Sequence, residues 1–410
     1  MDTQDGAVMT EVVRRADAVP LYGPRYVEDP KGVYADIRRK HGPVAPVLIE
    51  GDVPAWFVCG YRELHQVTAD AQLFARDSRR WNGWETVPDD WPLLPQLLHN
   101  PSVMFTEGPE HTRRAGALSD ALASIDQFEL ATQCERIADA MIDSFAGAGE
   151  AELMSQYVSR VTLRAGAVIC GLPEEAARML AENVMGAMSL STEDQLAAYA
   201  RMQEEMQRLV DSKREYPGAD VPSHLLADGA NLSGEEIMMD LLIVLTQAHG
   251  QTTKWIGNTI GLMLTDERFA ITISGGRASV GDALNEVLWH DTPTQNWLGR
   301  VATRDTTLGG QRIRAGDLLV LGLAAANADP HVRTAEGTAG NRAMMSFGHG
   351  EHGCPYPAPE LAELIAKTSI EVLVDRLPDL VLAEPLEWES TVWTRGLTSL
   401  RVSFTPTYVA

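Results

Sequence analysis

The feature that most constrains the fold is one long apolar stretch with the pattern of a single helix. Ser233 is a suitable N-cap, and Glu236 follows three residues later, as in a capping box. The helical pattern continues to about Leu264, so the helix is expected to extend roughly 45 Å at 1.5 Å per residue. One face carries apolar residues such as Ile237 and Leu241. A helix of this length and character requires a domain large enough to cover it.

Polar residues interrupt the apolar face of this helix near its middle. The interruption reads Gln247-Ala248-His249-Gly250-Gln251-Thr252-Thr253 and places a glycine inside a helix. Glycine costs about 1 kcal/mol there relative to alanine, and buried polar groups without partners cost more. Such an interruption usually has a function, so we predict a functional site at this point of the helix.

The rest of the chain indicates a mainly α fold with small β sheets. Its 410 residues show no repeat and no low-complexity linker, so we predict one domain over residues 1–410, with a flexible segment over residues 1–20. Apolar residues make up 45% of the sequence, which is enough for a large core. Helical patterns dominate from about residue 127 to 268. Two short strands are expected at residues 46–50 and 55–59, joined through Gly51-Asp52.

The charge balance argues against two classes of partner. The formal net charge is −23, from 34 Lys and Arg against 57 Asp and Glu, and such a chain repels both phosphate backbones and anionic membrane surfaces. The first twenty residues lack the apolar run of a signal peptide. The strongly apolar stretch 241–253 is shorter than the roughly 20 residues that cross a bilayer. With four scattered cysteines, these properties predict a cytoplasmic protein that binds neither nucleic acid nor membrane.

A loop rich in glycine and histidine leads to Cys354. It reads Phe347-Gly348-His349-Gly350-Glu351-His352-Gly353-Cys354 and precedes a predicted helix. Glycines let a chain turn tightly and approach a flat ligand, and a cysteine at a helix N-terminus has a lowered pKa that favours the thiolate. A lone cysteine is more often a buried structural residue. This loop, however, resembles the FGxGxHxC pattern of the cytochrome P450 family, in which the cysteine is the thiolate ligand of the haem iron.

The resemblance extends over nearly the whole chain. Residues 248–253 look like the family's oxygen-binding segment, Glu286 begins the family's ExxR motif, and residues 327–330 resemble its NRDP stretch. The resemblance implies the cytochrome P450 fold, a helical triangular prism with small β sheets, and haem b as the cofactor. The residues it implies for cofactor binding are Cys354, His111, Arg300, His352, Phe347 and Gly348, and those it implies for catalysis are Thr252, Gln251 and His249.

The sequence departs from the family pattern behind the haem. Trp289 stands where the ExxR motif has arginine, as in a rare bacterial subset of the family. A carboxylate left alone in the core would cost several kcal/mol, so Glu286 needs another cation, and we predict Arg342. Ala115 occupies the place of an arginine that commonly binds a haem propionate.

A further departure concerns proton delivery. Gln251 stands where the family usually has a carboxylate, and an amide can hold water but does not titrate. Thr252 with ordered water is the expected route, with His249 as a second candidate. The simpler interpretation of His249 is a core histidine that is satisfied by a hydrogen bond, and it is the one we favour.

The segments that roof the distal pocket in the family suggest a large, partly aromatic substrate site. Tryptophans in the loop after residue 75 could stack on an aromatic substrate or pack on the protein itself. The expected pocket residues are Trp81, Trp84, Val244, Gln247, Ala248, Gln295, Asn296, Trp297, Trp393 and Leu397.

No flavin or iron–sulfur segment is recognisable, so electrons are expected from an external ferredoxin and ferredoxin reductase. Arg113 and Arg114 are the candidates for the ferredoxin dock. The resemblance implies a monooxygenase of secondary metabolism that acts on a small organic natural product, which the predicted pocket suggests is aromatic. Two alternatives stay open: oxidative coupling or cyclisation without oxygen insertion, for example of tryptophan-containing cyclic dipeptides, and haem binding without turnover.

Overall fold

The computed structural model describes residues 17–88, 90–173, 175–176, 192–269, 279–332 and 340–407. Most of the segment predicted to be flexible, residues 1–16, lies outside them. The prediction extended this segment too far, because β1 (Val19–Pro20) pairs in parallel with β2 (Val44–Ile49).

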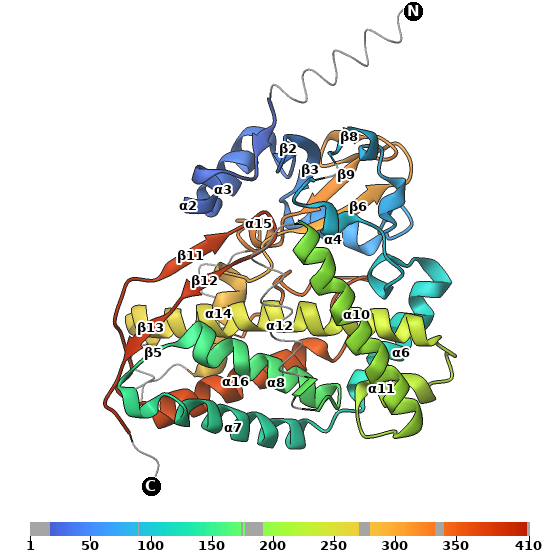
Figure 1. The fold of residues 1–410 in the computed structure, drawn as a ribbon. Helices are drawn as coiled ribbons and strands as arrows, with labels where there is room; N and C mark the ends of the chain where they lie inside the picture. The colour runs from blue at the N-terminus through green and yellow to red at the C-terminus, as the bar shows by residue number, and fades with distance from the viewer. Residues whose placement is uncertain are drawn as a thin grey trace, which may run out of the picture.

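The largest sheet lies at the top of the molecule in the view of Figure 1 and is built from segments far apart in the sequence. Its order is β1-β2-β3-β9-β6-β4, where the further strands are β3 (Val53–Val58), β9 (Leu318–Leu321), β6 (Trp297–Ala302) and β4 (Phe74–Ala75). The predicted hairpin is confirmed as β2 and β3, with Val44 opposite Val58. Its turn residues Gly51 and Asp52 both have positive φ, as the strand pairing requires.

Helices form the rest of the body. Next to the sheet lie α2 (Pro24–Glu28), α3 (Pro30–His41), α4 (Tyr61–Ala69), α5 (Leu94–Leu97) and α15 (Leu323–Asn327). The helical layers below contain α6 (Gly108–Ala123), α7 (Gln127–Asp143), α8 (Ser159–Ile169), α10 (Thr192–Glu215), α11 (Val221–Ala227), α12 (Gly234–Thr265), α14 (Val280–His290) and α16 (Ala358–Arg376). Small antiparallel pairings complete the fold: β10 (Val381–Leu382) and β5 (Glu150–Glu152) flank β13 (Arg401–Ser403), β11 (Glu387–Ser390) pairs with β12 (Arg395–Ser399), and β7 (Thr306–Leu308) with β8 (Gln311–Ile313).

Helix α12 runs through the middle of the molecule, and α10 crosses over it (Figure 1). Both halves of the predicted capping box are present: the Ser233 side chain accepts from the Glu236 amide, and the Glu236 carboxylate accepts from the Ser233 amide. The N-terminal half contributes Leu241 and its neighbours to one hydrophobic cluster, and the C-terminal half contributes Trp255 and its neighbours to another. The polar stretch 247–253 lies between these two clusters, so the interruption coincides with a break in the core.

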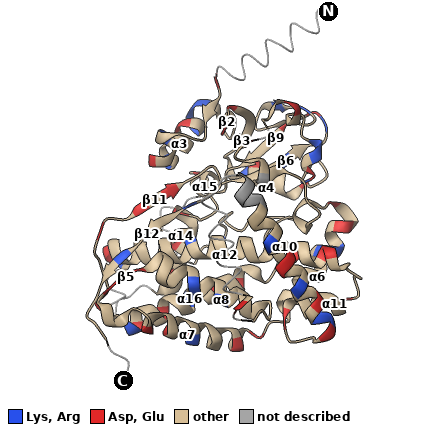
Figure 2. Ribbon diagram, in the orientation of Figure 1, with Lys and Arg blue, Asp and Glu red and all other residues tan. Residues whose placement is uncertain are grey.

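Charged residues are scattered over the outer elements, whereas most of α12 carries none (Figure 2). In the part of the chain that is described, no helix combines the length and apolar character needed to cross a membrane.

The capping box gives a test of the start of α12. Replacing Ser233 with alanine removes the acceptor for the Glu236 amide, so the free energy of unfolding is expected to fall by about 1 kcal/mol, measured by urea unfolding. Ser212→Ala, at an exposed position of α10, is the matched control and should change it little. Equal stability of the two variants would contradict the role of the cap.

Candidate functional site

The loop before Cys354 folds back on itself. The Cys354 amide donates to the Phe347 carbonyl at 2.8 Å. Gly348 and Gly350 have φ values of 71° and 73°, which side chains disfavour. A Cβ on Gly350 would lie 2.2 Å from the Thr68 carbonyl oxygen of α4. The loop conformation therefore requires glycine at this position, and it brings the loop close to α4.

Cys354 differs from the other three cysteines in its surroundings. Cys59, Cys134 and Cys170 are buried, whereas Cys354 is exposed. Helix α16 begins only at Ala358, so Cys354 does not lie at the helix N-terminus as predicted. Although the residue as a whole is accessible, protein atoms surround its sulfur, and this desolvation raises the pKa of the thiol to about 12, so the predicted lowering of the pKa is wrong for the protein without a metal ion. A bound metal ion would still deprotonate it, as coordinating thiols are.

Two buried arginines lie beside this loop. Arg300 and Arg76 are 2% and 3% exposed. Neither has a carboxylate within salt-bridge distance in the described part of the chain. Burial lowers the pKa of Arg300 to about 10, and burial together with Arg300 lowers that of Arg76 to about 9. The pair is a concentration of positive charge for which the described residues provide no counter-ion.

Two histidines join these arginines. The rings of His111 and His352 lie 4.0 Å apart, and His111 Nε2 is 3.0 Å from the Glu351 carbonyl oxygen. Burial lowers the pKa of His352 to about 2, helped by Arg300 and His111, so its ring is neutral. His352 Nε2 and Arg300 Nε are buried and have no hydrogen-bond partner.

This group fits the carboxylates of a haem better than a metal ion. His111, Glu351 and His352 could place ligand atoms within 4.8 Å of one another. Two nearby guanidinium groups would repel a divalent cation, however, and they would attract an anion. The unpartnered Arg300 Nε and the buried His352 ring lie where the resemblance places haem propionates, so the residues present fit the cofactor.

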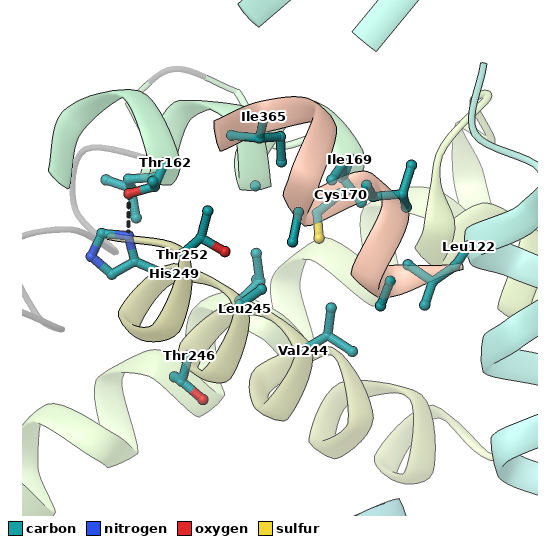
Figure 3. A pocket seen from close by; sticks show the side chains of 16 residues that line it. Leu122, Thr162, Ile169, Cys170, Val244, Leu245, Thr246, His249, Thr252 and Ile365 are labelled. Atoms are coloured by element: carbon teal, nitrogen blue, oxygen red, sulfur yellow. Dashed lines mark hydrogen bonds between the residues drawn. The ribbon is translucent and has the colours of Figure 1, made fainter. Parts of the chain in front are cut away.

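The polar stretch of α12 borders a small cavity of about 70 Å³ (Figure 3). Val244, Ala248 and Thr252 line it from α12, and Leu361 and Ile365 line it from α16. Its lining is largely apolar. Two of the predicted pocket residues, Val244 and Ala248, are thus together at a cavity, whereas Gln247 does not line it.

His249 is held in the core. Its Nδ1 lies 3.0 Å from the Thr162 hydroxyl (Figure 3). The Thr162 hydroxyl also lies 2.8 Å from the Thr253 hydroxyl. Burial lowers the pKa of His249 to about 4, so the ring is neutral near pH 7. This contact with α8 matches the simpler interpretation of a satisfied core histidine.

Thr252 and Gln251 are the least satisfied polar groups of the stretch. Thr246, Thr259 and Thr265 of the same helix donate to backbone carbonyls one turn earlier. In contrast, Thr252 makes no hydrogen bond within the described residues, and its side chain borders the cavity. Gln251 Oε1 is buried without a partner. Both groups are therefore available to water or to a ligand.

The predicted ion pair of Glu286 with Arg342 is wrong. Glu286 Oε1 lies 3.2 Å from Arg268 Nη2 and 3.5 Å from His290 Nε2. Arg342 instead forms a bidentate pair with Glu363 of α16, at 2.8 and 2.9 Å. The cation for Glu286 comes from the end of the segment after α12, which sequence spacing alone did not indicate.

Trp289, at the position where the family has arginine, is a residue of the hydrophobic core. Its ring is buried in the same cluster as Trp255, and its indole Nε1 donates to the Asn341 carbonyl at 2.9 Å. Apolar packing and one hydrogen bond therefore replace an ion pair.

The predicted aromatic roof is wrong for two tryptophans. Trp81 is buried in the core beneath the sheet, 4.9 Å from Trp84 and 5.8 Å from Trp91 between ring centroids. The Trp84 indole donates to the Ser78 carbonyl at 2.7 Å. The three rings pack on each other, which was the alternative to a substrate role.

Gln295 and Asn296 are also structural. Gln295 donates to the Thr394 carbonyl at 3.3 Å and accepts from the Tyr34 hydroxyl. Asn296 donates to the Tyr26 hydroxyl at 2.8 Å. These amides join the β11–β12 turn to the N-terminal helices, so the prediction that they point at the substrate is wrong.

The segment between β11 and β12 and the start of β12 carry two of the predicted pocket residues, Trp393 and Leu397. Trp393 lies 5.1 Å from Trp297 between ring centroids, and the Arg76 guanidinium lies over Trp297 at 5.6 Å. Leu397 is buried in the cluster of the C-terminal half of α12 and is absent from the lining of the cavity beside Thr252.

Arg114 cannot be part of a ferredoxin dock. Its side chain is 1% exposed and its Nε donates to Asp240 of α12 at 3.0 Å, so this part of the prediction is wrong. Arg113 is partly exposed and pairs with Glu236. Both arginines join α6 to the start of α12.

Comparison with known proteins agrees with the fold. No protein-family model matches the chain. The chain is 26% identical over 398 residues to the vitamin D(3) 25-hydroxylase of Pseudonocardia autotrophica, covering 94% of this chain and 96% of that protein. It is 29% identical over 421 residues to the cytochrome P450 monooxygenase PikC of Streptomyces venezuelae, covering 98% and 96%. Among solved structures, CYP154C4 from Streptomyces sp. W2061 matches with a TM-score of 0.84 and 25% identity, over 96% of this chain and 99% of that one.

A mainly helical fold with small sheets and a site suited to haem define the class as a haem-binding oxidoreductase. The chain belongs to the cytochrome P450 family. Its cofactor is haem b with a cysteine thiolate ligand.

The surroundings of His249 predict a pH dependence. The unfolded chain protonates this histidine below about pH 6.5, whereas in the folded protein its pKa is about 4. Folding stability is therefore expected to fall as the pH falls from about 6.5 to 4, because the unfolded state binds the proton more readily. In urea unfolding, His249→Gln should lose less stability over this range than the native protein.

His224→Gln, at an exposed position in α11, is the matched control and should follow the native pH dependence. A His249→Gln variant with the native pH dependence would contradict a buried neutral imidazole.

Proposed function

We propose that this cytochrome P450 is a monooxygenase that hydroxylates a small, largely apolar organic compound of bacterial secondary metabolism, with Cys354 as the haem ligand. The observation that carries the proposal is the exposed Cys354 in a glycine-dependent loop beside buried cations that lack a counter-ion. The other cysteines are buried in hydrophobic surroundings and offer no comparable site. The proposal treats residues 1–410 as one domain.

The roles of the residues around the haem follow from their contacts. Phe347 and Gly348 shape the loop, and Phe347 packs edge to face on Trp255 of α12 at 5.8 Å. Arg300, with the imidazoles of His111 and His352 as hydrogen-bonding partners, would hold the haem carboxylates. The bound haem iron with its thiolate supplies the activation of dioxygen, since the thiolate pushes electron density toward iron and favours O–O cleavage.

Thr252 is the proposed group for proton delivery. Its hydroxyl borders the cavity and has no protein partner among the described residues, so it can hold an ordered water. The unpartnered Gln251 Oε1 can accept a hydrogen bond from such a water but cannot titrate. His249 keeps the Thr162 and Thr253 hydroxyls in place and acts as a positioning residue.

The substrate site is proposed above the haem, next to Val244 and Ala248, with Trp297 and Trp393 at its far side. Two features argue against oxidative coupling of aromatic substrates as the first choice. Trp81 is buried in a hydrophobic cluster with Trp84 packed against it, and Gln295 and Asn296 are hydrogen-bonded to the protein. The remaining lining is mostly aliphatic, which suits an apolar substrate.

The proposed electron donors are a ferredoxin and a ferredoxin reductase, in the cytoplasm. Because Arg114 is buried and Arg113 is paired, the dock needs other residues than those two.

The haem ligand is tested by Cys354→Ser. The reduced native protein is expected to give a thiolate-type carbon monoxide difference spectrum, and the serine variant is expected to lose it. Cys134→Ala is the matched control, because this cysteine is buried in α7 and does not line the cavity, and it should keep the native spectrum. A thiolate-type spectrum in Cys354→Ser, or none in the native protein, would overturn the proposal.

Thr252→Ala tests proton delivery. With a compound that shifts the haem absorption and is converted, product formed per NADPH is expected to fall about tenfold or more, since positioned proton donors contribute about 10²–10⁴ in rate. Haem content should stay native, and Thr252→Ser should recover most of the yield. Thr259→Ala, whose hydroxyl donates to the Trp255 carbonyl, is the control. An unchanged yield in Thr252→Ala would rule out this role.

A further inference from the structure

Arg76 and Arg300 face each other across two neighbouring strands. Strand β4 pairs with β6 in antiparallel register, with Phe74 opposite Ala302 and Ala75 opposite Val301. The same register places Arg76, the next residue, opposite Arg300. Like charges directly opposite on a sheet are destabilising, more so where both are buried. Something must balance these two charges in the working protein.

The protein fixes Arg76 firmly in this place. Its Nε donates to the Met104 carbonyl at 3.1 Å, and its Nη1 donates to the carbonyls of Leu298 at 2.8 Å and Gly299 at 3.0 Å. Its guanidinium also lies 5.6 Å from the ring centroids of Phe105 and Trp297. These contacts orient the group without neutralising it, because carbonyls and aromatic rings carry no net charge.

The acidic groups nearby are engaged elsewhere or exposed. Glu107 accepts from the Asp77 amide at 2.8 Å and from Arg80 at 3.2 Å. Glu351 is exposed. The imidazoles that join the group, His111 and His352, add hydrogen-bonding capacity but no negative charge. A bound ligand with two negative charges would therefore balance the two arginines.

We propose that Arg76 is a second cation for the haem carboxylates, standing in for the arginine that Ala115 of α6 replaces. This inference rests on the proposed function, since it takes the haem to be bound at Cys354. Two arginines then match the two propionates of haem b in charge. Ala115 packs beside a hydrophobic cluster and leaves α6 without that cation, so β4 supplies it across the sheet from Arg300.

The test is the rate at which haem leaves the holoprotein for an excess of apomyoglobin. Arg76→Gln keeps hydrogen-bonding capacity and removes the charge, so it is expected to lose haem at least about tenfold faster than the native protein, in line with the loss of a charge-assisted hydrogen bond. Arg76→Lys should lie between the two. Arg79→Gln removes an exposed charge three residues away and should keep the native rate.

Haem dimethyl ester provides the decisive comparison, because its propionates carry no charge. With the ester, Arg76→Gln and the native protein should lose the cofactor at rates within about twofold of each other. A difference that persists with the ester would mean that Arg76 acts through the fold, and it would overturn the inference. An equal rate of loss for Arg76→Gln and native protein with ordinary haem would overturn it as well.

The outcomes also separate this inference from the proposed function. A native protein with a thiolate-type carbon monoxide spectrum but an Arg76→Gln variant with native haem loss refutes only the role of Arg76. If that variant instead weakens the binding of carboxylate-bearing compounds, measured by the shift of the haem absorption, Arg76 is a substrate anchor and the inference fails. A native protein without the thiolate-type spectrum refutes both.

Discussion

A helix that is buried along most of its length has to be covered on all sides, and this requirement organises the molecule around α12. Five helices, α8, α10, α11, α14 and α16, pack against it, and its two halves belong to different hydrophobic clusters. The polar stretch lies between the two clusters and borders a largely apolar cavity beside Thr252. The same burial that stabilises the fold therefore determines where a ligand can lie.

Buried charge is treated in two different ways in this protein. Arg114 is matched with Asp240, whose carboxylate also accepts from the Val103 amide at 2.6 Å, so the ion pair joins α6 and α12 to the loop before α6. Arg76 and Arg300 have no such match. Leaving one charge of a buried pair alone is strongly destabilising, so unmatched buried charges are informative about ligands. The paired arginine is part of the fold, whereas the unpaired arginines are the ones that we propose to bind the haem carboxylates.

The departures from the family pattern have separate physical solutions. Trp289 removes the need for a cation at its own position by filling the space with an apolar ring. Glu286 pairs instead with Arg268, which lies just after the end of α12. Gln251 has a buried side-chain carbonyl oxygen without a hydrogen-bond partner. The neighbouring Thr252 hydroxyl also has no protein partner in the described part of the chain. Glu286 is thus paired with a different cation, while Gln251 and Thr252 keep polar atoms without a partner among the described residues.

The sequence by itself determined the features that depend on neighbouring residues. The capping box predicted the start of α12, Gly51-Asp52 predicted the hairpin, and the glycines around Cys354 predicted a tight loop, because turn geometry and capping are local. Only the tertiary structure decided the partners of Glu286 and Arg342, the burial of Gln295 and Trp81, and the position of Arg76 opposite Arg300. These depend on which segments meet in space. The sequence around Arg76, which directly follows the short apolar strand β4, does not indicate that Arg300 lies opposite it on the neighbouring strand.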